Sequence, residues 1–204
     1  MLIIHFIRHA ESEGNIDYER IGGRQNHLKL TANGLTQAHK LQQFLQKNKD
    51  LNIVHVRSSV AQRAKKTAKI ATTHLEQEIV FDERIVELHN GEWEGKPRKL
   101  MEEAIDEQKQ LGNDWKAPGG ESANDVIKRV LPALQEVLEL YEKDVQKHVL
   151  WFGHATAIRS LVHHLLEAEH LIFRSSMHNT ARTVLTWNGE HWYLHRYNDT
   201  QHLI

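Results

Sequence analysis

Short apolar runs alternate with stretches of helical periodicity along most of the chain. Four runs predict buried strands, at residues 2–7, 51–56, 79–81 and 148–152. Four other segments carry apolar side chains at every third or fourth position, as amphipathic helices do. The helices predicted in this way begin near Thr31, Val60, Ser122 and Ala157. Because such alternation is typical of α/β proteins, we predict a three-layer sandwich with a mostly parallel central sheet and helices on both faces.

Two of the predicted helices have a marked inner face. The first can be capped by Thr31, and its inner positions are Leu35, Ala38, Leu41 and Leu45. The third has an apolar stripe made of Val126, Val130, Leu134, Val137 and Tyr141. Pro132 lies inside that stripe. Because proline removes a backbone hydrogen bond, we expect a kink or two abutting helices there.

The last part of the chain predicts a β-hairpin. Residues 183–187 and 191–197 flank Asn188-Gly189, a strong short-range signal for a tight turn between antiparallel strands. The sheet should therefore finish with an antiparallel edge. Because a loop or a second subunit can cover such an edge, a homodimer is one expectation.

The length and patterning favour one domain. The chain has 204 residues, which suits a single domain with a sizeable core, and it contains no internal repeat or linker-like tract. A polar, helix-like stretch and a loop at 96–117 interrupt the alternation of strands and helices. We therefore expect a single domain over residues 1–204, with a helical insertion around 96–121 beside the functional site.

Composition excludes several classes of function. The 26 Lys and Arg residues nearly balance the 27 Asp and Glu residues, so no basic field is available for a nucleic-acid backbone. The chain has no cysteine, which excludes disulfides, thiolate metal sites and a cysteine nucleophile. The apolar start is too short for a signal peptide and is interrupted by His5, and no run reaches the length of a membrane span. We expect a cytoplasmic protein with no nucleic-acid or membrane partner.

Polar side chains follow three of the predicted strands. They are Arg8-His9, Arg57-Ser58-Ser59 and Gly153-His154. Arg63 begins the helix after the second strand, and Glu87 follows the third. Because ligands of open α/β sheets bind outside the carboxyl ends of the strands, we expect imidazoles, guanidinium groups and a carboxylate to meet there.

This combination of side chains suits a phosphomonoester. Arginine presents a planar fork that matches phosphoryl oxygens, so Arg8 and Arg63 could clamp the transferring group. A neutral imidazole is a competent nucleophile toward phosphorus, and a carboxylic acid can protonate the leaving alkoxide. With enough fixed cationic donors, this chemistry needs no metal or other cofactor. The predicted activity is hydrolysis of a small phosphorylated metabolite with release of inorganic phosphate.

Several motifs, in order along the chain, resemble one family. Residues 8–15, Arg-His-Ala-Glu-Ser-Glu-Gly-Asn, resemble the Arg-His-Gly motif of the histidine phosphatase superfamily, in its phosphoglycerate-mutase-like branch. Further similar segments are residues 30–38, 59–68, 87–95, 118–122 and 152–155. Two departures are Ala10, where many members have glycine, and Ala155-Thr156, where Gly-Gly or Gly-Asn is usual. Alanine accepts close approach less well than glycine, so we expect a slightly tighter pocket.

The resemblance implies roles for individual residues. It implies His9, Glu87 and His154 as catalytic residues, with His9 phosphorylated during the reaction and Glu87 donating a proton to the leaving group. The phosphoryl group would be bound by Arg8, Arg63 and His154, supported by Asn15 and the backbone N–H of Ala155. We also expect a carbonyl oxygen beside Nδ1 of His9, so that Nε2 faces phosphorus.

Three alternatives remain beside hydrolysis. A phosphoglycerate mutase needs additional cationic contacts and a lid, and the paired arginines of the family's mutases are missing from residues 113–118. We therefore expect a phosphatase, whose leaving-group wall includes Trp93, Arg98 and Trp115. A protein that binds a phosphorylated ligand without turnover would need neither nucleophile nor acid. Metal binding by the histidine-rich segment 163–170 is the third alternative, but its spacing lacks the zincin pattern.

Overall fold

The structure is a computed structural model and describes residues 1–141 and 146–204. Its centre is a six-stranded sheet in the order β3-β2-β4-β1-β5-β6. The strands are β1 (Leu2–Arg8), β2 (Ile53–Ser59), β3 (Ile79–Asp82), β4 (Lys147–Gly153), β5 (Arg182–Trp187) and β6 (Trp192–Asp199). The first four are parallel, while β5 is antiparallel to both β1 and β6. The predicted parallel sheet with an antiparallel edge hairpin is thus confirmed.

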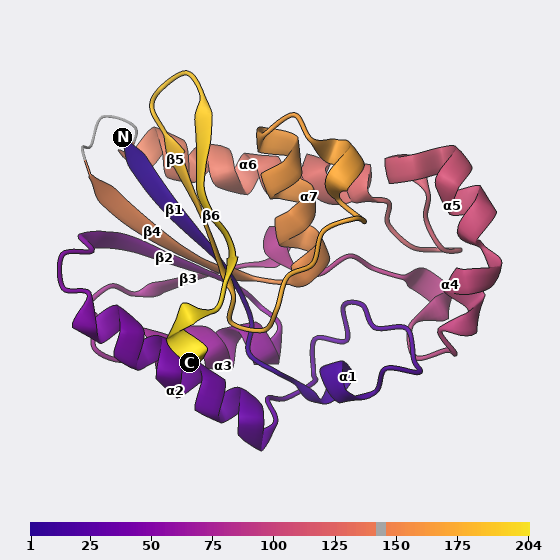
Figure 1. Ribbon diagram of the computed structural model, residues 1–204, viewed down its shortest axis with the longest axis horizontal. Coiled ribbons are helices and arrows are strands. Elements are labelled where there is room, and N and C mark those ends of the chain that lie inside the picture. Colours follow the sequence, from indigo (N-terminus) through magenta and orange to yellow (C-terminus); the bar gives the residue numbers. More distant parts are fainter. Residues whose placement is uncertain (142–145) are drawn as a thin grey trace.

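Helices cover both faces of this sheet (Figure 1). The α-helices of the described residues are α1 (Glu13–Ile16), α2 (Ala32–Lys47), α3 (Gln62–Ala71), α4 (Lys99–Glu103), α5 (Ile105–Leu111), α6 (Ala123–Tyr141) and α7 (Ala155–Leu165). In Figure 1, α2 and α3 lie on one side of the sheet, and α6 and α7 lie on the other. The three-layer α/β architecture is therefore confirmed. Among the described residues, no helix combines the length and the apolar character that crossing a bilayer requires.

Two apolar cores hold the layers together, one on each side of the sheet. Trp151 of β4 packs with Phe6 and with residues of α6 and α7. The neighbouring residues Leu150 and Phe152 belong to the other core, together with Leu41 of α2. Because side chains alternate along a strand, one buried strand supplies both cores. Both faces of the sheet are therefore buried, and the functional side chains at the ends of the parallel strands lie at one edge.

One predicted inner position of α2 is wrong, and of the two outcomes expected at Pro132 the abutting helices are excluded while the kink stays a prediction. Leu35 is 37% exposed, and the inward position of α2 is taken by Gly34. The helix lies so close to the preceding loop that a Cβ atom on Gly34 would meet the backbone oxygen of Glu11. Helix α6 runs through Pro132 without a break, so two abutting helices do not form. Buried Val130 and Leu134 on either side of the proline hold the helix against the core, which outweighs one missing hydrogen bond.

The expected insertion at 96–121 contains α4 and α5. These helices lie apart from the four that cover the sheet, at one end of the molecule (Figure 1). The chain enters them beside the loop that follows β1, since Arg20 forms a short antiparallel bridge with Pro97. The organisation of residues 1–204 as a single domain stays a prediction.

Candidate active site

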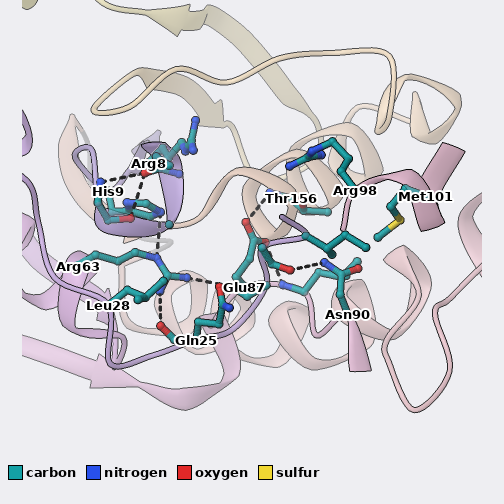
Figure 2. Close-up of a pocket in the computed structure, with 17 residues that line it drawn as sticks. Arg8, His9, Gln25, Leu28, Arg63, Glu87, Asn90, Arg98, Met101 and Thr156 are labelled. Carbon is teal, nitrogen blue, oxygen red and sulfur yellow. Dashed lines mark hydrogen bonds between the residues drawn. The ribbon is translucent and has the colours of Figure 1, made fainter. Parts of the chain in front are cut away.

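A cavity of about 230 Å³ opens beyond the carboxyl ends of the parallel strands. Five of the predicted site residues line it: Arg8, His9, Asn15, Arg63 and Glu87. Figure 2 shows Arg63 reaching toward His9, with Glu87 nearby. Residues far apart in the chain are brought together because β4 pairs with both β1 and β2 in the sheet.

His9 immediately follows β1 and is held from both sides. Its backbone N–H donates to Gly153 O at 2.9 Å, at the end of β4. Its ring nitrogen Nδ1 lies 2.7 Å from Ala10 O, and Arg63 Nε–H donates to Nε2 at 3.2 Å. A carbonyl accepts only from a protonated nitrogen, so this network assigns the proton to Nδ1 and leaves a lone pair on Nε2. The expected carbonyl beside Nδ1 is confirmed.

The surroundings keep the His9 imidazole neutral. Burial lowers its pKa well below the usual value of 6.5, and the nearby Arg63 and Arg8 guanidinium groups lower the pKa further. The hydrogen bond to Ala10 O acts in the opposite direction but is outweighed. A neutral ring with an unprotonated Nε2 is the form of histidine that can attack phosphorus.

Arg63 is fixed before any ligand arrives. It lies in the first turn of α3, and its guanidinium group donates to three consecutive carbonyl oxygens of the loop after β1. These are Gly23 O at 3.1 Å, Arg24 O at 3.1 Å and Gln25 O at 2.9 Å. These bonds hold the Arg63 guanidinium group beside His9 in advance, so Arg63 need not change its conformation when an anion binds.

Arg8 supplies a second cation. Its Nη1 donates to Met177 O at 2.6 Å. Burial lowers its pKa to about 10, although the nearby Glu87 carboxylate opposes this effect. Arg8 therefore remains charged at neutral pH, and the cavity carries two guanidinium groups beside the neutral imidazole.

The carboxylate of Glu87 sits on the first turn of α7. Oε1 accepts the backbone N–H groups of Leu88 at 2.9 Å and Ala157 at 3.0 Å, and Oε2 accepts that of Thr156 at 3.1 Å. The N-terminus of a helix has unpaired N–H groups and favours negative charge. These bonds fix the carboxylate at the wall of the cavity, from which it can exchange a proton with a bound ligand.

Two predicted residues lie behind the cavity instead of lining it. His154 is fully buried, its Nε2 lies 2.8 Å from Ser59 Oγ, and its ring stands edge-on to His9 with centroids 5.1 Å apart. Burial, with the nearby Arg63, lowers the pKa of His154 well below its usual value. Thr156, and not Ala155, reaches the cavity from α7. The roles expected for His154 and Ala155 stay predictions.

The expectation that Arg57 joins the site is wrong. Strand β2 continues to Ser59, so Arg57 lies within the strand and points away from the cavity. It donates to buried Asp82 at 2.7 Å and to exposed Glu136 at 3.2 Å in an ion cluster away from the cavity. Of the three polar residues at this strand end, only Ser59 contacts a predicted site residue.

The expected leaving-group wall is partly wrong. Arg98 lines the cavity, but Trp93 and Trp115 do not. The two tryptophans pack against each other, with ring centroids 5.8 Å apart. The wall is formed instead by residues that the sequence did not single out for this role: Ile21, Gln25, Leu28, Leu88, Asn90 and Met101.

A segment near the end of the chain also supports the site. Asn179 Nδ2 donates to His9 O and to Asn15 Oδ1, both at 3.1 Å. Thr180 N–H donates to Arg8 O at 3.1 Å. No sequence signal marked these residues, because their role depends on the pairing of β5 with β1.

The histidine-rich segment makes ordinary contacts. His163 Nε2 lies 2.7 Å from Ser175 Oγ, and His164 Nδ1 lies 2.9 Å from Glu169 Oε1. Within the part of the chain that the structure describes, no group of three or more His, Asp or Glu side chains is arranged to hold a metal ion.

Known proteins share this sequence and fold. Residues 4–200 match the model of the histidine phosphatase superfamily, branch 1. A protein of Salmonella choleraesuis named probable phosphoglycerate mutase GpmB is 35% identical over 170 residues, which cover 81% of this chain and 75% of that protein.

Solved structures agree over the full length. Bacillus stearothermophilus YhfR has a TM-score of 0.85 at 26% identity, and a mutant phosphoserine phosphatase from Entamoeba histolytica, in complex with phosphoserine, has 0.83 at 26%; both matches cover 100% of each chain. The fold is also that of a mycobacterial glucosyl-3-phosphoglycerate phosphatase, with a TM-score of 0.86 at 24% identity over 97% of this chain and 99% of that one. The relatives thus carry names of phosphatases and of a mutase, and this chain is an enzyme that belongs to branch 1 of the histidine phosphatase superfamily.

Proposed function

We propose that the protein hydrolyses small phosphomonoesters without a metal ion, through a phosphohistidine formed on Nε2 of His9. The observation that carries this proposal is the state of the His9 ring. Its Nδ1 proton is held by Ala10 O, and its Nε2 lies beside Arg63 at the wall of the cavity. A nucleophile with this tautomer needs no base to activate it.

The reaction then proceeds in two displacements. In the first, the Nε2 lone pair attacks phosphorus, the ester P–O bond breaks, and the protonated form of Glu87, which is the starting state of the cycle, gives its proton to the departing oxygen. In the second, water attacks the phosphoryl group, the P–N bond breaks, and the Glu87 carboxylate takes the proton of the water. The products are the alcohol and inorganic phosphate, and both His9 and Glu87 return to their starting states.

The fixed cations supply the electrostatic stabilisation. Negative charge spreads over the equatorial phosphoryl oxygens in the transition state. Arg8 and Arg63 are both held by backbone carbonyls, so they need not reorganise when that charge develops. This arrangement supports the metal-independent reading of the chemistry.

A phosphoglycerate mutase is the second candidate, and the 35% identical relative with that name favours it. A mutase must hold a phosphorylated substrate against additional cations. Beyond Arg8 and Arg63, the lining residues that the structure describes include one more cation, Arg98. We therefore propose water, and not a second hydroxyl, as the usual acceptor.

Phosphate release from a panel of phosphomonoesters in EDTA tests this function. We expect turnover that survives the chelator and disappears in His9→Ala, while His39→Ala, at an exposed position of α2, keeps full activity. With phosphoglycerate as substrate, we expect phosphate and no isomerised product. Efficient isomerisation without phosphate release would establish the mutase, and loss of activity in EDTA would reject the metal-independent mechanism.

A further inference from the structure

The segment Pro118-Gly119-Gly120-Glu121-Ser122 has no part in the reaction described above. It leads into α6 and packs against the chain just after Glu87. Gly120 approaches so closely that a Cβ atom on it would lie 2.7 Å from His89 O. Glu121 N–H donates to His89 O at 2.7 Å, and His89 N–H donates back to Glu121 Oε2 at 3.1 Å. Each residue therefore donates one hydrogen bond to the other, and these two bonds fix the backbone after Glu87 to Glu121.

The Glu121 carboxylate also holds two arginines. Arg129 of α6 donates through Nε to Oε1 at 2.9 Å and through Nη2 to Oε2 at 3.0 Å. Arg24, from the loop after β1, donates to Oε1 at 2.6 Å. The side chains of Glu121 and Arg129 are only 19% and 18% exposed. Although burial raises the pKa of Glu121, the hydrogen bonds and charges of the arginines outweigh it, so the pKa lies below its usual value.

Both arginines converge on the carbonyl oxygen of Glu87. Arg129 Nη2 donates to Glu87 O at 3.0 Å, and Arg24 Nε donates to the same atom at 3.3 Å. Without Glu121, two like charges would meet at this carbonyl with no counter-charge between them. The Glu121 carboxylate therefore fixes the positions of Arg24 and Arg129. The two arginines in turn fix the backbone of Glu87, whose side chain reaches α7.

We propose that Glu121 is a positioning residue for proton transfer: it fixes the Glu87 backbone through Arg24 and Arg129, so that the Glu87 carboxyl group meets the leaving-group oxygen. This inference rests on the proposed function, in which Glu87 is the proton donor. It predicts that loss of Glu121 weakens protonation of the leaving group more than phosphoryl binding, because Arg63, although bonded to Arg24 O, is also held by Gly23 O and Gln25 O.

The variant Glu121→Gln tests this with two classes of ester. Alkyl phosphates have poor leaving groups that need a proton, so we expect their kcat/KM, which reports the first displacement and not the later attack of water, to fall about 10-fold to 100-fold, as for a misplaced catalytic group. For p-nitrophenyl phosphate, whose leaving group departs as a stable anion, we expect a fall of no more than about threefold. The inhibition constant of inorganic phosphate should stay within about twofold, because the guanidinium clamp is intact.

Two reference variants complete the comparison. Glu87→Gln removes the proton donor itself and should show the same preference for the aryl ester more strongly. In the double variant, Glu121→Gln should add nothing to Glu87→Gln, because a residue that acts through Glu87 has no effect once Glu87 is disabled. Asp199→Asn is the matched control, since it breaks the partly buried ion pair with Arg182 (2.6 Å), neither member of which lines the cavity. It should affect both ester classes equally.

Equal losses for alkyl and aryl esters, or additive losses in the double variant, would overturn the proposal. If Glu121→Gln does not fold, Arg129→Lys keeps the charge but not the two parallel bonds, and the same preference is expected. The backbone amide NMR resonances of Thr156 and Ala157, which bond to the Glu87 carboxylate, give a readout independent of turnover. Unchanged resonances in both variants would overturn the inference, whereas an inactive unmodified enzyme would count against the proposed function alone.

Discussion

At the scale of single residues, the site depends on which nitrogen of His9 carries a proton. Ala10 O fixes the proton on Nδ1, and Ala10 is fixed in turn by Thr67 of α3. Thr67 Oγ1 accepts Ala10 N–H at 3.0 Å and donates to Arg63 O at 2.7 Å. The buried Thr67 hydroxyl thus connects the turn that contains His9 with α3, the helix that carries Arg63.

Removal of that hydroxyl should lower the rate. In Thr67→Val the shape of the side chain is kept, but Ala10 N–H loses its acceptor, so the carbonyl that orients His9 is no longer fixed. We expect kcat to fall about 10-fold or more, with a smaller change in KM. Thr67→Ser keeps the hydroxyl and should recover most of the rate. Equal activity of the valine and serine variants would show that the contact has no catalytic role.

The depressed pKa of His9 fixes the acid side of the pH profile. His9 must be neutral to attack, so activity falls as the pH drops through its pKa. Because burial, Arg63 and Arg8 lower that pKa, the fall should lie well below pH 6.5. Removal of one cation in Arg63→Gln should move the His9 pKa upward, which NMR of labelled histidine rings measures directly.

Lys66→Gln is the control for this shift. Lys66 lies on the exposed side of α3. Lys66→Gln therefore removes one positive charge, as Arg63→Gln does, at a position away from the site. An equal displacement of the His9 titration in both variants would contradict a local effect of Arg63.

At the scale of elements, the turn that contains His9 follows β1 and packs against the start of α2. Gly34, in the first turn of α2, is buried against the backbone of Glu11, two residues after His9. A Cβ atom at this position would lie 2.0 Å from Glu11 O, so the helix or the loop would have to move.

Gly34→Ala should therefore impair both stability and catalysis. We expect unfolding in urea to require about 1–3 kcal/mol less free energy, and turnover to fall because the loop after His9 is displaced. Thr36→Ala, at an exposed position of the same helix, should leave turnover unchanged. Full activity in a destabilised Gly34→Ala would show that the helix contact does not position the nucleophile.

The elements could be predicted because buried side chains recur at regular intervals along strands and helices. The apolar runs and helical spacings located β1 to β4 and the four long helices, and Asn188-Gly189 located the final hairpin. The direction in which a side chain points was harder to predict. Leu35 was expected to face the core, because the contact that turns Gly34 inward, its close approach to Glu11, is a tertiary contact that no local pattern shows. Arg57 was placed in the site because the end of β2 was set too early. A side chain one position along a strand faces the opposite way.

The site could be predicted only in part. His9, Arg8, Arg63 and Glu87 are close to strand ends or helix starts, where topology brings them together. Trp93 and Trp115 were expected at the wall, but their rings pack against each other. Asn179 depends on a strand pairing between the two ends of the chain, which no local pattern reveals.

At the scale of the whole molecule, buried neutral histidines link stability to pH. Burial is the main cause that lowers the pKa of His5 to about 3 and those of His55 and His202 to about 4. Below pH 6.5 the unfolded chain binds protons at these residues while the folded chain does not, so acid favours unfolding.

The free energy of unfolding should therefore decrease from about pH 7 to about pH 5, by about 2 kcal/mol per histidine. Urea titrations at several pH values measure this slope. His55→Gln should make the slope shallower, whereas His27→Gln, on the exposed loop after β1, should leave it unchanged. A stability that does not depend on pH in this range would contradict the account of neutral buried histidines.

The proposed mechanism requires that His9 carries the phosphoryl group during turnover, and trapping of the phosphorylated enzyme shows whether it does. The enzyme is mixed with a radiolabelled phosphomonoester, quenched in alkali, which preserves phosphohistidine, and digested into peptides. We predict label on the peptide that contains His9, formed before steady-state turnover and absent from His9→Ala. Turnover by His9→Ala, or a label that forms on another residue, would contradict the mechanism.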